Sequence, residues 1–167
     1  MRPMLKVVTL CAMAVLSASS LSGCGYAPLY ARSDVTAGLG SIAIDAPQTR
    51  TGYFLEQDLR NGFGSDEDSQ KLYKLTITMK EQHYSVGIRV DDTSTRSEIT
   101  NNIAYTLTNV QTGKVIYKDH FTDTVTYDTS VSPFTGIVSQ QDGQVRIATS
   151  ISRKIQTGLA LYFHDKH

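Results

Sequence analysis

The chain has 167 residues, and its 16 Lys and Arg are balanced by 16 Asp and Glu, so the formal net charge is zero. This balance excludes the strongly basic surface that is typical of nucleic-acid binding proteins. One of the two cysteines lies in an apolar N-terminal segment, so the rest of the chain has no cysteine pair, and a hydrophobic core must hold the fold.

The first 24 residues have the features of a bacterial lipoprotein signal. Arg2 and Lys6 form a basic start, and the apolar stretch at 7–16 is too short to cross a bilayer about 30 Å thick. The tetrad Leu21-Ser22-Gly23-Cys24 matches a lipobox. It predicts a signal peptide over 1–23, cleavage between Gly23 and Cys24, and acylation of Cys24 by diacylglycerol and a further chain such as palmitate. An ordinary secretory signal with an incidental cysteine is the alternative.

Two or three acyl chains would anchor the mature chain permanently, because each buried methylene contributes about 0.8 kcal/mol. Gly25, rather than Asp, follows the cysteine, which favours the outer membrane under the sorting rule of enteric bacteria. Without Arg2 and Lys6 the mature chain has 16 − 2 = 14 basic residues against 16 acidic ones, a net charge of −2. It contains no second apolar run long enough to span a membrane.

Residues 24–40 are predicted to be the lipidated N-terminus and a tether, since Pro28, Gly38 and Gly40 interrupt any apolar period. A single domain is expected over 41–167. It would begin with a short strand at 41–45 and a helix at 51–63, in which Phe54 or Leu55, Leu59 and Phe63 recur at helical spacing.

Three long strands are predicted after a polar loop at 64–70. Apolar residues occupy odd positions from Tyr73 to Met79 and even positions from Tyr84 to Val90, which indicates a β-bulge between Met79 and Tyr84. Two separate strands broken near Glu81 are the alternative. The next two strands carry their apolar residues on odd positions, namely Ile99, Ile103, Tyr105, Leu107, Val115, Tyr117, Phe121, Val125 and Tyr127.

The last predicted element is a helix over 139–163, with an earlier start if Ser132-Pro133 caps it. Its apolar stripe is expected to comprise Val138, Val145, Ala148, Ile151 or Ser152, Ile155, Leu159 and Tyr162. The order of elements predicts an α+β fold: a two-layer sandwich with a four-stranded mixed sheet and two helices on one face (β-α-β-β-β-α). The first crossover should make the first two strands parallel.

The chain resembles the lipopolysaccharide-assembly lipoproteins of the LptE family, in their alphaproteobacterial form. The likeness is clearest at Cys24-Gly25-Tyr26-Ala27-Pro28-Leu29-Tyr30, where that family often reads Cys-Gly-Phe-x-Pro-Leu-Tyr. It continues through most of the mature chain, at Ile42 and Ile44, Leu59-Arg60-Asn61, Thr95-Arg96, Ala104-Tyr105-x-Leu107, Thr112-Gly113-x-Val115, Tyr127 and Ser132-Pro133-Phe134. Thr135 departs from the small Ala expected after the aromatic residue.

The resemblance implies a non-enzymatic lipoprotein that faces the periplasm, plugs the large outer-membrane barrel LptD, and takes part in moving lipopolysaccharide to the outer leaflet. Lipopolysaccharide phosphates would need basic side chains, and four lie near the ends of the predicted strands: Arg89, Arg96, Lys114 and Lys118. A solvated strand rim explains the same residues. The predicted sheet face opposite the apolar one would carry Thr100, Thr106, Thr108, Thr122, Thr124 and Thr126, which suits a wet barrel interior.

Other classes of function have less support in the sequence. His83, His120, His164 and His167 form no metal-binding pattern, and neither a nucleophile motif nor a glycine-rich phosphate loop occurs, so no metal, cofactor or catalytic residue is expected. An auxiliary lipoprotein of an envelope lipid ABC transporter and, less favoured, a lipid-tethered periplasmic hydrolase remain the alternatives.

Overall fold

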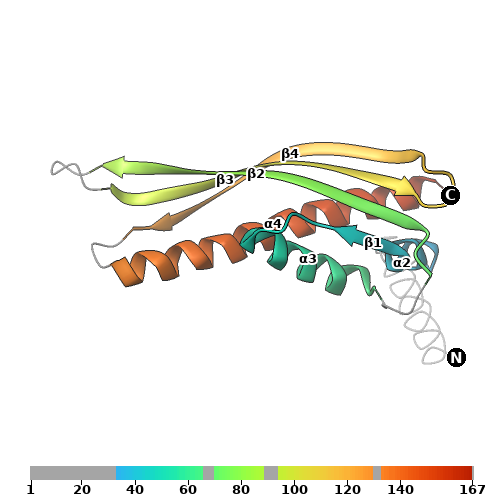
Figure 1. Ribbon diagram of the computed structural model, residues 1–167, viewed down its shortest axis with the longest axis horizontal. Coiled ribbons are helices and arrows are strands. Elements are labelled where there is room, and N and C mark those ends of the chain that lie inside the picture. The colour runs from blue at the N-terminus through green and yellow to red at the C-terminus, as the bar shows by residue number, and fades with distance from the viewer. Residues whose placement is uncertain (1–32, 66–69, 89–93, 130–132, 167) are drawn as a thin grey trace, which may run out of the picture.

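The computed structural model describes residues 33–65, 70–88, 94–129 and 133–166. Its elements are α2 (Ser33–Gly40), β1 (Ile42–Asp45), α3 (Arg50–Phe63), β2 (Tyr73–Ile88), β3 (Ser94–Asn109), β4 (Val115–Asp128) and α4 (Pro133–Asp165). The strands form one sheet in the order β1-β2-β3-β4, and the helices lie on one face of it (Figure 1). β1 pairs in parallel with β2 and the other pairs are antiparallel, so the predicted sandwich is confirmed.

Helix α2 corrects the tether prediction for residues 33–40, whereas residues 24–32 and the predicted signal peptide lie outside the described residues. Val35 is fully buried and Leu39 is 2% exposed, so this single apolar pair at i, i+4 is part of the core. Gly38 had indicated a break, but here it allows close packing: an added Cβ would lie 3.0 Å from the Phe163 ring. Residues 33–40 therefore belong to the folded unit.

Helix α3 matches its predicted span within one residue and has clear signals at both ends. The Thr49 hydroxyl accepts a hydrogen bond from the Gly52 amide at the N-terminus. Gly64 ends the helix in a left-handed conformation with φ 59°. Leu55 and Leu59 are fully buried and Phe63 nearly so, which confirms the predicted stripe.

Strand β2 has no bulge, so both predictions for its middle are wrong. Its pairing with β3 keeps one register from Tyr73 opposite Asn109 to Ile88 opposite Ser94. The odd positions therefore stay on the helix-facing side throughout, and Tyr84 lies on the opposite face, 47% exposed. The apolar residues change from odd to even positions after Met79 because the helices cover less of the sheet there. The backbone pairing itself does not change.

Strands β3 and β4 place Tyr105 and Tyr117 on the helix-facing side, as predicted. Leu107 pairs with Tyr117, but the register shifts at the next position, where Thr108 pairs with Val115. The irregularity therefore lies beside the β3–β4 turn, where Gly113 adopts a φ of 65°. Because of this shift, Val115 leaves the apolar face and is 56% exposed.

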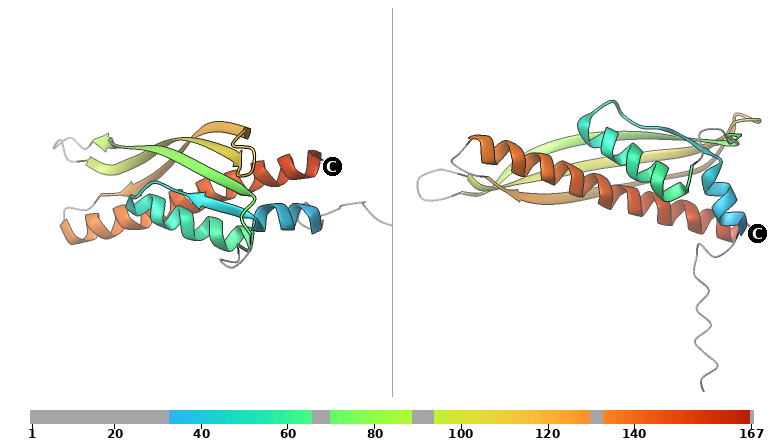
Figure 2. Two further views of the ribbon diagram at one scale, coloured as in Figure 1. Left: turned by 45° about the vertical axis from the view of Figure 1, so that its right-hand side comes forward. Right: turned by 90° about the horizontal axis from the view of Figure 1, so that it is seen from below.

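Helix α4 begins at Pro133, the earlier of the two expected starts, and its 33 residues extend along most of the molecule (Figure 2). Ala148, Ile151, Ile155 and Leu159 are fully buried against the sheet and α3. Val138 and Val145, also assigned to the stripe, are exposed because the first turns of α4 extend beyond α3. None of the helices in the described part of the chain is long and apolar enough to span a membrane.

Candidate functional site

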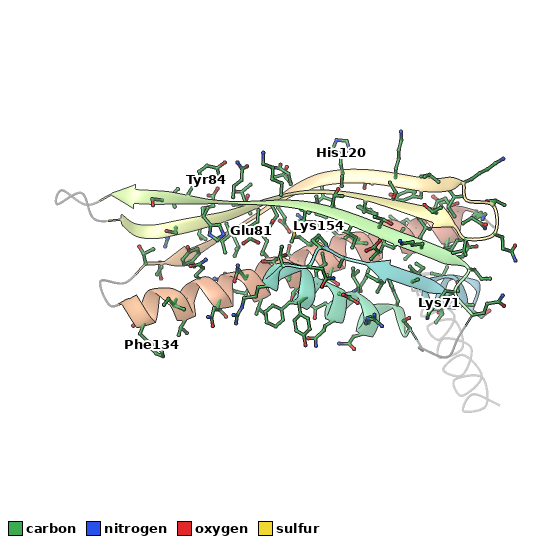
Figure 3. All side chains as sticks on the ribbon, in the orientation of Figure 1. Lys71, Glu81, Tyr84, His120, Phe134 and Lys154 are labelled. Atoms are coloured by element: carbon green, nitrogen blue, oxygen red, sulfur yellow. The ribbon has the colours of Figure 1, made fainter. Side chains whose placement is uncertain are left out.

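The outer face of the sheet has no helix against it (Figure 3). We define this face as the even-numbered residues of β2 and β3 together with those of β4 from Lys118 to Asp128. Its middle is rich in hydroxyl groups that bond to one another across the strands. The Thr100 and Thr124 hydroxyls are 3.1 Å apart, and the Thr122 hydroxyl donates to Asn102 Oδ1 at 2.8 Å. The predicted threonine face is therefore present, although charged residues lie around it, namely Lys74, Lys80, Arg96, Glu98, Lys118 and Asp128.

A shallow hollow of about 370 Å³ lies near the centre of this outer face. Ala104 forms its floor, because its methyl group stands in a row between the larger Thr78 and His120. Lys80 and Asn102 complete its polar rim. The hollow can accept a protruding side chain from a partner, and its hydroxyl, amide and imidazole groups can both donate and accept hydrogen bonds.

The basic residues predicted to contact lipopolysaccharide do not converge. Arg96 lies near the start of β3 and pairs with Asp128 at 3.5 Å. Lys118 faces Thr106, ten residues further along β3, which corresponds to about 34 Å of strand. Lys114 is in the turn beside Lys118, and Arg89 lies outside the described residues. Two of the four residues thus share one end of the sheet, and Arg96 is at the other.

A partly buried polar cluster on the helix-facing side was not predicted. Glu81 lies opposite Asn101, which is fully buried, and its carboxylate accepts bonds from Thr51 Oγ1 at 2.6 Å and Gln144 Nε2 at 3.1 Å. His83 and Asn101 provide two further contacts, at 2.9 and 3.4 Å. The signal that could have indicated this cluster was Glu81, because it is the next odd position after Met79. In a strand without a break, that position lies on the helix-facing side.

This cluster is suited to holding elements together rather than to catalysis. It joins β2 and β3 to the first turn of α3 and to the middle of α4. Thr51 is only 1% exposed, so no substrate can reach its hydroxyl in this structure.

Stability should depend on the ionisation of Glu81. Burial raises the pKa of this carboxyl, but its four hydrogen bonds outweigh burial and hold the pKa below the ordinary value of 4.5. The stabilisation is therefore present above the unfolded pKa and is lost as the pH falls through the folded one. We expect the urea concentration at the unfolding midpoint of the wild type to decrease as the pH is lowered below about 4.5. Glu81→Gln should lower stability at pH 7 by about 1–3 kcal/mol and weaken this pH dependence; an unchanged pH dependence in the variant would contradict the assignment.

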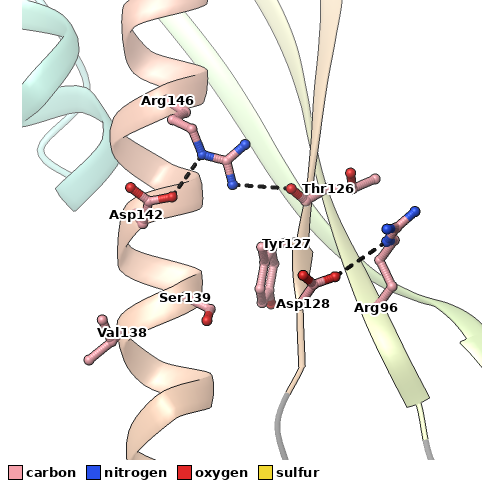
Figure 4. A pocket seen from close by; sticks show the side chains of 8 residues that line it. All are labelled: Arg96, Thr126, Tyr127, Asp128, Val138, Ser139, Asp142 and Arg146. Atoms are coloured by element: carbon pink, nitrogen blue, oxygen red, sulfur yellow. Dashed lines mark hydrogen bonds and ion pairs between the residues drawn. The ribbon is translucent and has the colours of Figure 1, made fainter.

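A polar groove of about 560 Å³ separates the start of α4 from the end of β4 (Figure 4). Arg146 donates to Asp142 at 2.8 Å and to the Thr126 carbonyl at 3.1 Å, and Arg96 faces Asp128 on the other wall. Each guanidinium is thus matched by a carboxylate, so the groove does not concentrate positive charge for an anion.

The first two turns of α4 expose an apolar tip, which we define as Phe134, Ile137 and Val138. Their exposures are 77%, 55% and 48%, and Phe134 points away from the sheet (Figure 3). Contiguous exposed apolar side chains of this kind commonly mark a protein contact surface. Within the described residues, no group of three or more His, Cys, Asp or Glu side chains is placed to hold a metal ion.

Comparison with solved structures identifies relatives among bacterial lipoproteins. A chain from Caulobacter crescentus CB15 described as a lipoprotein is 34% identical, with a TM-score of 0.69 over 80% of this chain and 97% of that one. Rare lipoprotein B from Shewanella oneidensis (9% identity, TM-score 0.53, 75% and 98% coverage) and a minor lipoprotein from Acinetobacter baumannii (12%, 0.50, 72% and 89%) share the fold. No protein-family model and no curated protein matches the sequence.

The identity to the Caulobacter protein over nearly its whole length shows the family. This chain belongs to the same family of bacterial lipoproteins.

Proposed function

We propose that this protein is the small lipoprotein partner of an LptD-type outer-membrane barrel in lipopolysaccharide assembly, without enzymatic activity. The observation that carries the proposal is the outer face of the sheet, which is uncovered, rich in hydroxyls and hollowed at Ala104. From Thr100 to Thr108 of β3 and from Thr122 to Thr126 of β4 this face carries no Lys or Glu, and its hydroxyl groups can bond either to a barrel wall or to trapped water. The sequence resemblance to the LptE family supports the same role.

Photo-crosslinking in cells tests this proposal. A crosslinking residue at Thr106 or Thr124, both on the outer face, should capture a large β-barrel protein. The control is Thr157, an exposed residue of α4 whose hydroxyl donates to the Arg153 carbonyl in the preceding turn of the same helix. Capture from Thr157 alone, or of an inner-membrane permease complex in place of a barrel, would count against the proposal and, in the second case, favour a role in lipid ABC transport.

The proposed anchor has its own test. We expect Cys24→Ala to abolish acylation and release the mature chain from the membrane fraction, or leave it as a precursor, because no other lipid attachment is predicted. Membrane fractionation and mass spectrometry measure both outcomes. A wild-type mature chain with an unmodified Cys24 would contradict the prediction, and an inner-membrane location would contradict the proposed outer-membrane site.

A further inference from the structure

The hollow at Ala104 offers a partner more hydrogen-bond donors than acceptors. The Thr78 hydroxyl is already used, since it donates to the Ala104 carbonyl at 3.1 Å, and Asn102 Oδ1 already accepts from a threonine of β4 at 2.8 Å. Among the described residues, no side chain bonds to Asn102 Nδ2, to the Lys80 ammonium or to the His120 ring. Because an ammonium and an amide nitrogen can only donate, the hollow is complementary to an acceptor.

The centre of the outer face carries unmatched positive charge. Its four central rows, which cross β3 at the even positions from 100 to 106, contain Lys80 and Lys118 but no Asp or Glu. The acidic residue of this face nearest to Ala104 is Glu98, six residues away along β3 (104 − 98 = 6), or about 20 Å of strand. Within the part of the chain that the structure describes, neither lysine forms an ion pair, so a partner can supply the opposite charge.

Enclosure of this face by a barrel would take the two lysines out of bulk water. Loss of hydration is costly for an ammonium unless an opposite charge and hydrogen bonds replace the water. The carboxylates on the helix-facing side cannot do so, because side chains alternate between the two faces of a strand, and Asp123 there already binds Lys154 at 2.8 Å. The negative charge must consequently come from the partner.

We infer that the hollow receives an aspartate or glutamate side chain from the wall of the barrel partner. Lys80 on β2 and His120 on β4 lie on either side of β3, and His120 projects from the face that the helices leave bare (Figure 3). A carboxylate seated on the Ala104 methyl group would accept hydrogen bonds from Lys80 and from Asn102 Nδ2. The inference rests on the proposed function, because it is the barrel wall that covers this face.

A first experiment locates the barrel residue that faces the hollow. A photo-crosslinking residue at Thr106, two positions from Ala104 on the same face, is introduced into the full-length chain and activated in cells. Mass spectrometry should place the crosslink on a barrel strand with an inward Asp or Glu within about 10 Å, or three residues, of the attachment point. A captured strand without such an acid overturns this inference alone, whereas capture of no barrel from either Thr106 or Thr124 overturns the proposed function with it.

Charge reversal measures the contribution of Lys80. In Lys80→Glu the barrel carboxylate would meet a second carboxylate, so the affinity of the mature chain for the captured barrel should fall by at least about 30-fold. Arg153→Glu is the matched control, because it makes the same change of charge at an exposed position of α4, and its affinity should stay within about twofold of the wild type. Changing the barrel acid found by crosslinking to Lys should restore the affinity for Lys80→Glu.

A further variant tests the shape of the hollow while its charges stay in place. The side chain of Ala104→Leu would fill the floor of the hollow, so the affinity for the barrel should fall by about fivefold or more. Because this position and Lys80 are both exposed, circular dichroism should show both variants folded. Wild-type affinity for the barrel in both variants overturns the inference. A loss confined to the binding of purified lipopolysaccharide also overturns it, since the hollow would then take a phosphate in place of a carboxylate.

Discussion

The Ile155→Asp variant is expected to be largely unfolded at room temperature. Ile155 is fully buried in the middle of α4, so the substitution removes a packed side chain and places an unpaired charge in the core. The combined loss of at least about 4 kcal/mol approaches the whole stability of a typical domain. Circular dichroism during thermal unfolding measures it.

Arg153→Ala is the control for this variant, since it changes the same helix two residues away at an exposed position. Its stability should stay within about 0.5 kcal/mol of the wild type. If Ile155→Asp and Arg153→Ala unfolded at the same temperature, α4 would not pack as described.

The Gly52→Ala variant is expected to lose about 2–4 kcal/mol, a large effect for one methyl group. A Cβ at this position would lie 2.0 Å from the Pro47 carbonyl oxygen and 3.1 Å from Thr49 Oγ1, so the chain entering α3 must move. That movement would disturb the N-terminal cap, in which the Thr49 hydroxyl accepts a hydrogen bond from the Gly52 amide. Urea unfolding gives the difference directly.

Gly40→Ala tests whether the effect arises from the close approach rather than from the loss of a glycine. Its added Cβ would have only ordinary contacts, the nearest at 3.7 Å from the Gly64 carbonyl oxygen. A change of about 0.5 kcal/mol or less is expected there. Equal losses in the two variants would mean that the approach of Pro47 to α3 is not as tight as described.

The sequence predicted the fold class because each main element has one apolar side over most of its length. In α3 and the second half of α4, helical spacing identified most of the buried residues, from Leu55 to Leu159, but it missed Ile147, Ala160 and Phe163. The spacing did not predict α2, since eight residues with two glycines contain a single apolar pair, and the helix packs against α3 and α4. Short helices of this kind are specified by their tertiary contacts rather than by their own pattern.

The candidate site could be predicted in part. The threonines of β3 and β4 alternate with core residues. Their common face could therefore be predicted once Tyr105 and Tyr117 were expected to lie on the same side of the sheet. The cluster around Glu81 could not be found in this way, because the phase change at Tyr84 was attributed to the backbone. Where β2 extends beyond the helices, its apolar side chains change from odd to even positions, while its hydrogen bonds to β3 continue in one register.

The dependence of the first elements on α4 limits the order in which this chain can fold. Strands β2, β3 and β4 are joined by consecutive antiparallel pairings, so the meander can form from neighbouring segments as soon as they are available. Helices α2 and α3 instead pack against α4, which comes last in the chain, and β1 must wait for β2. The N-terminal third of the domain therefore has no complete core to join until α4 is in place, so local opening of α4 should release α2 and α3 together with it.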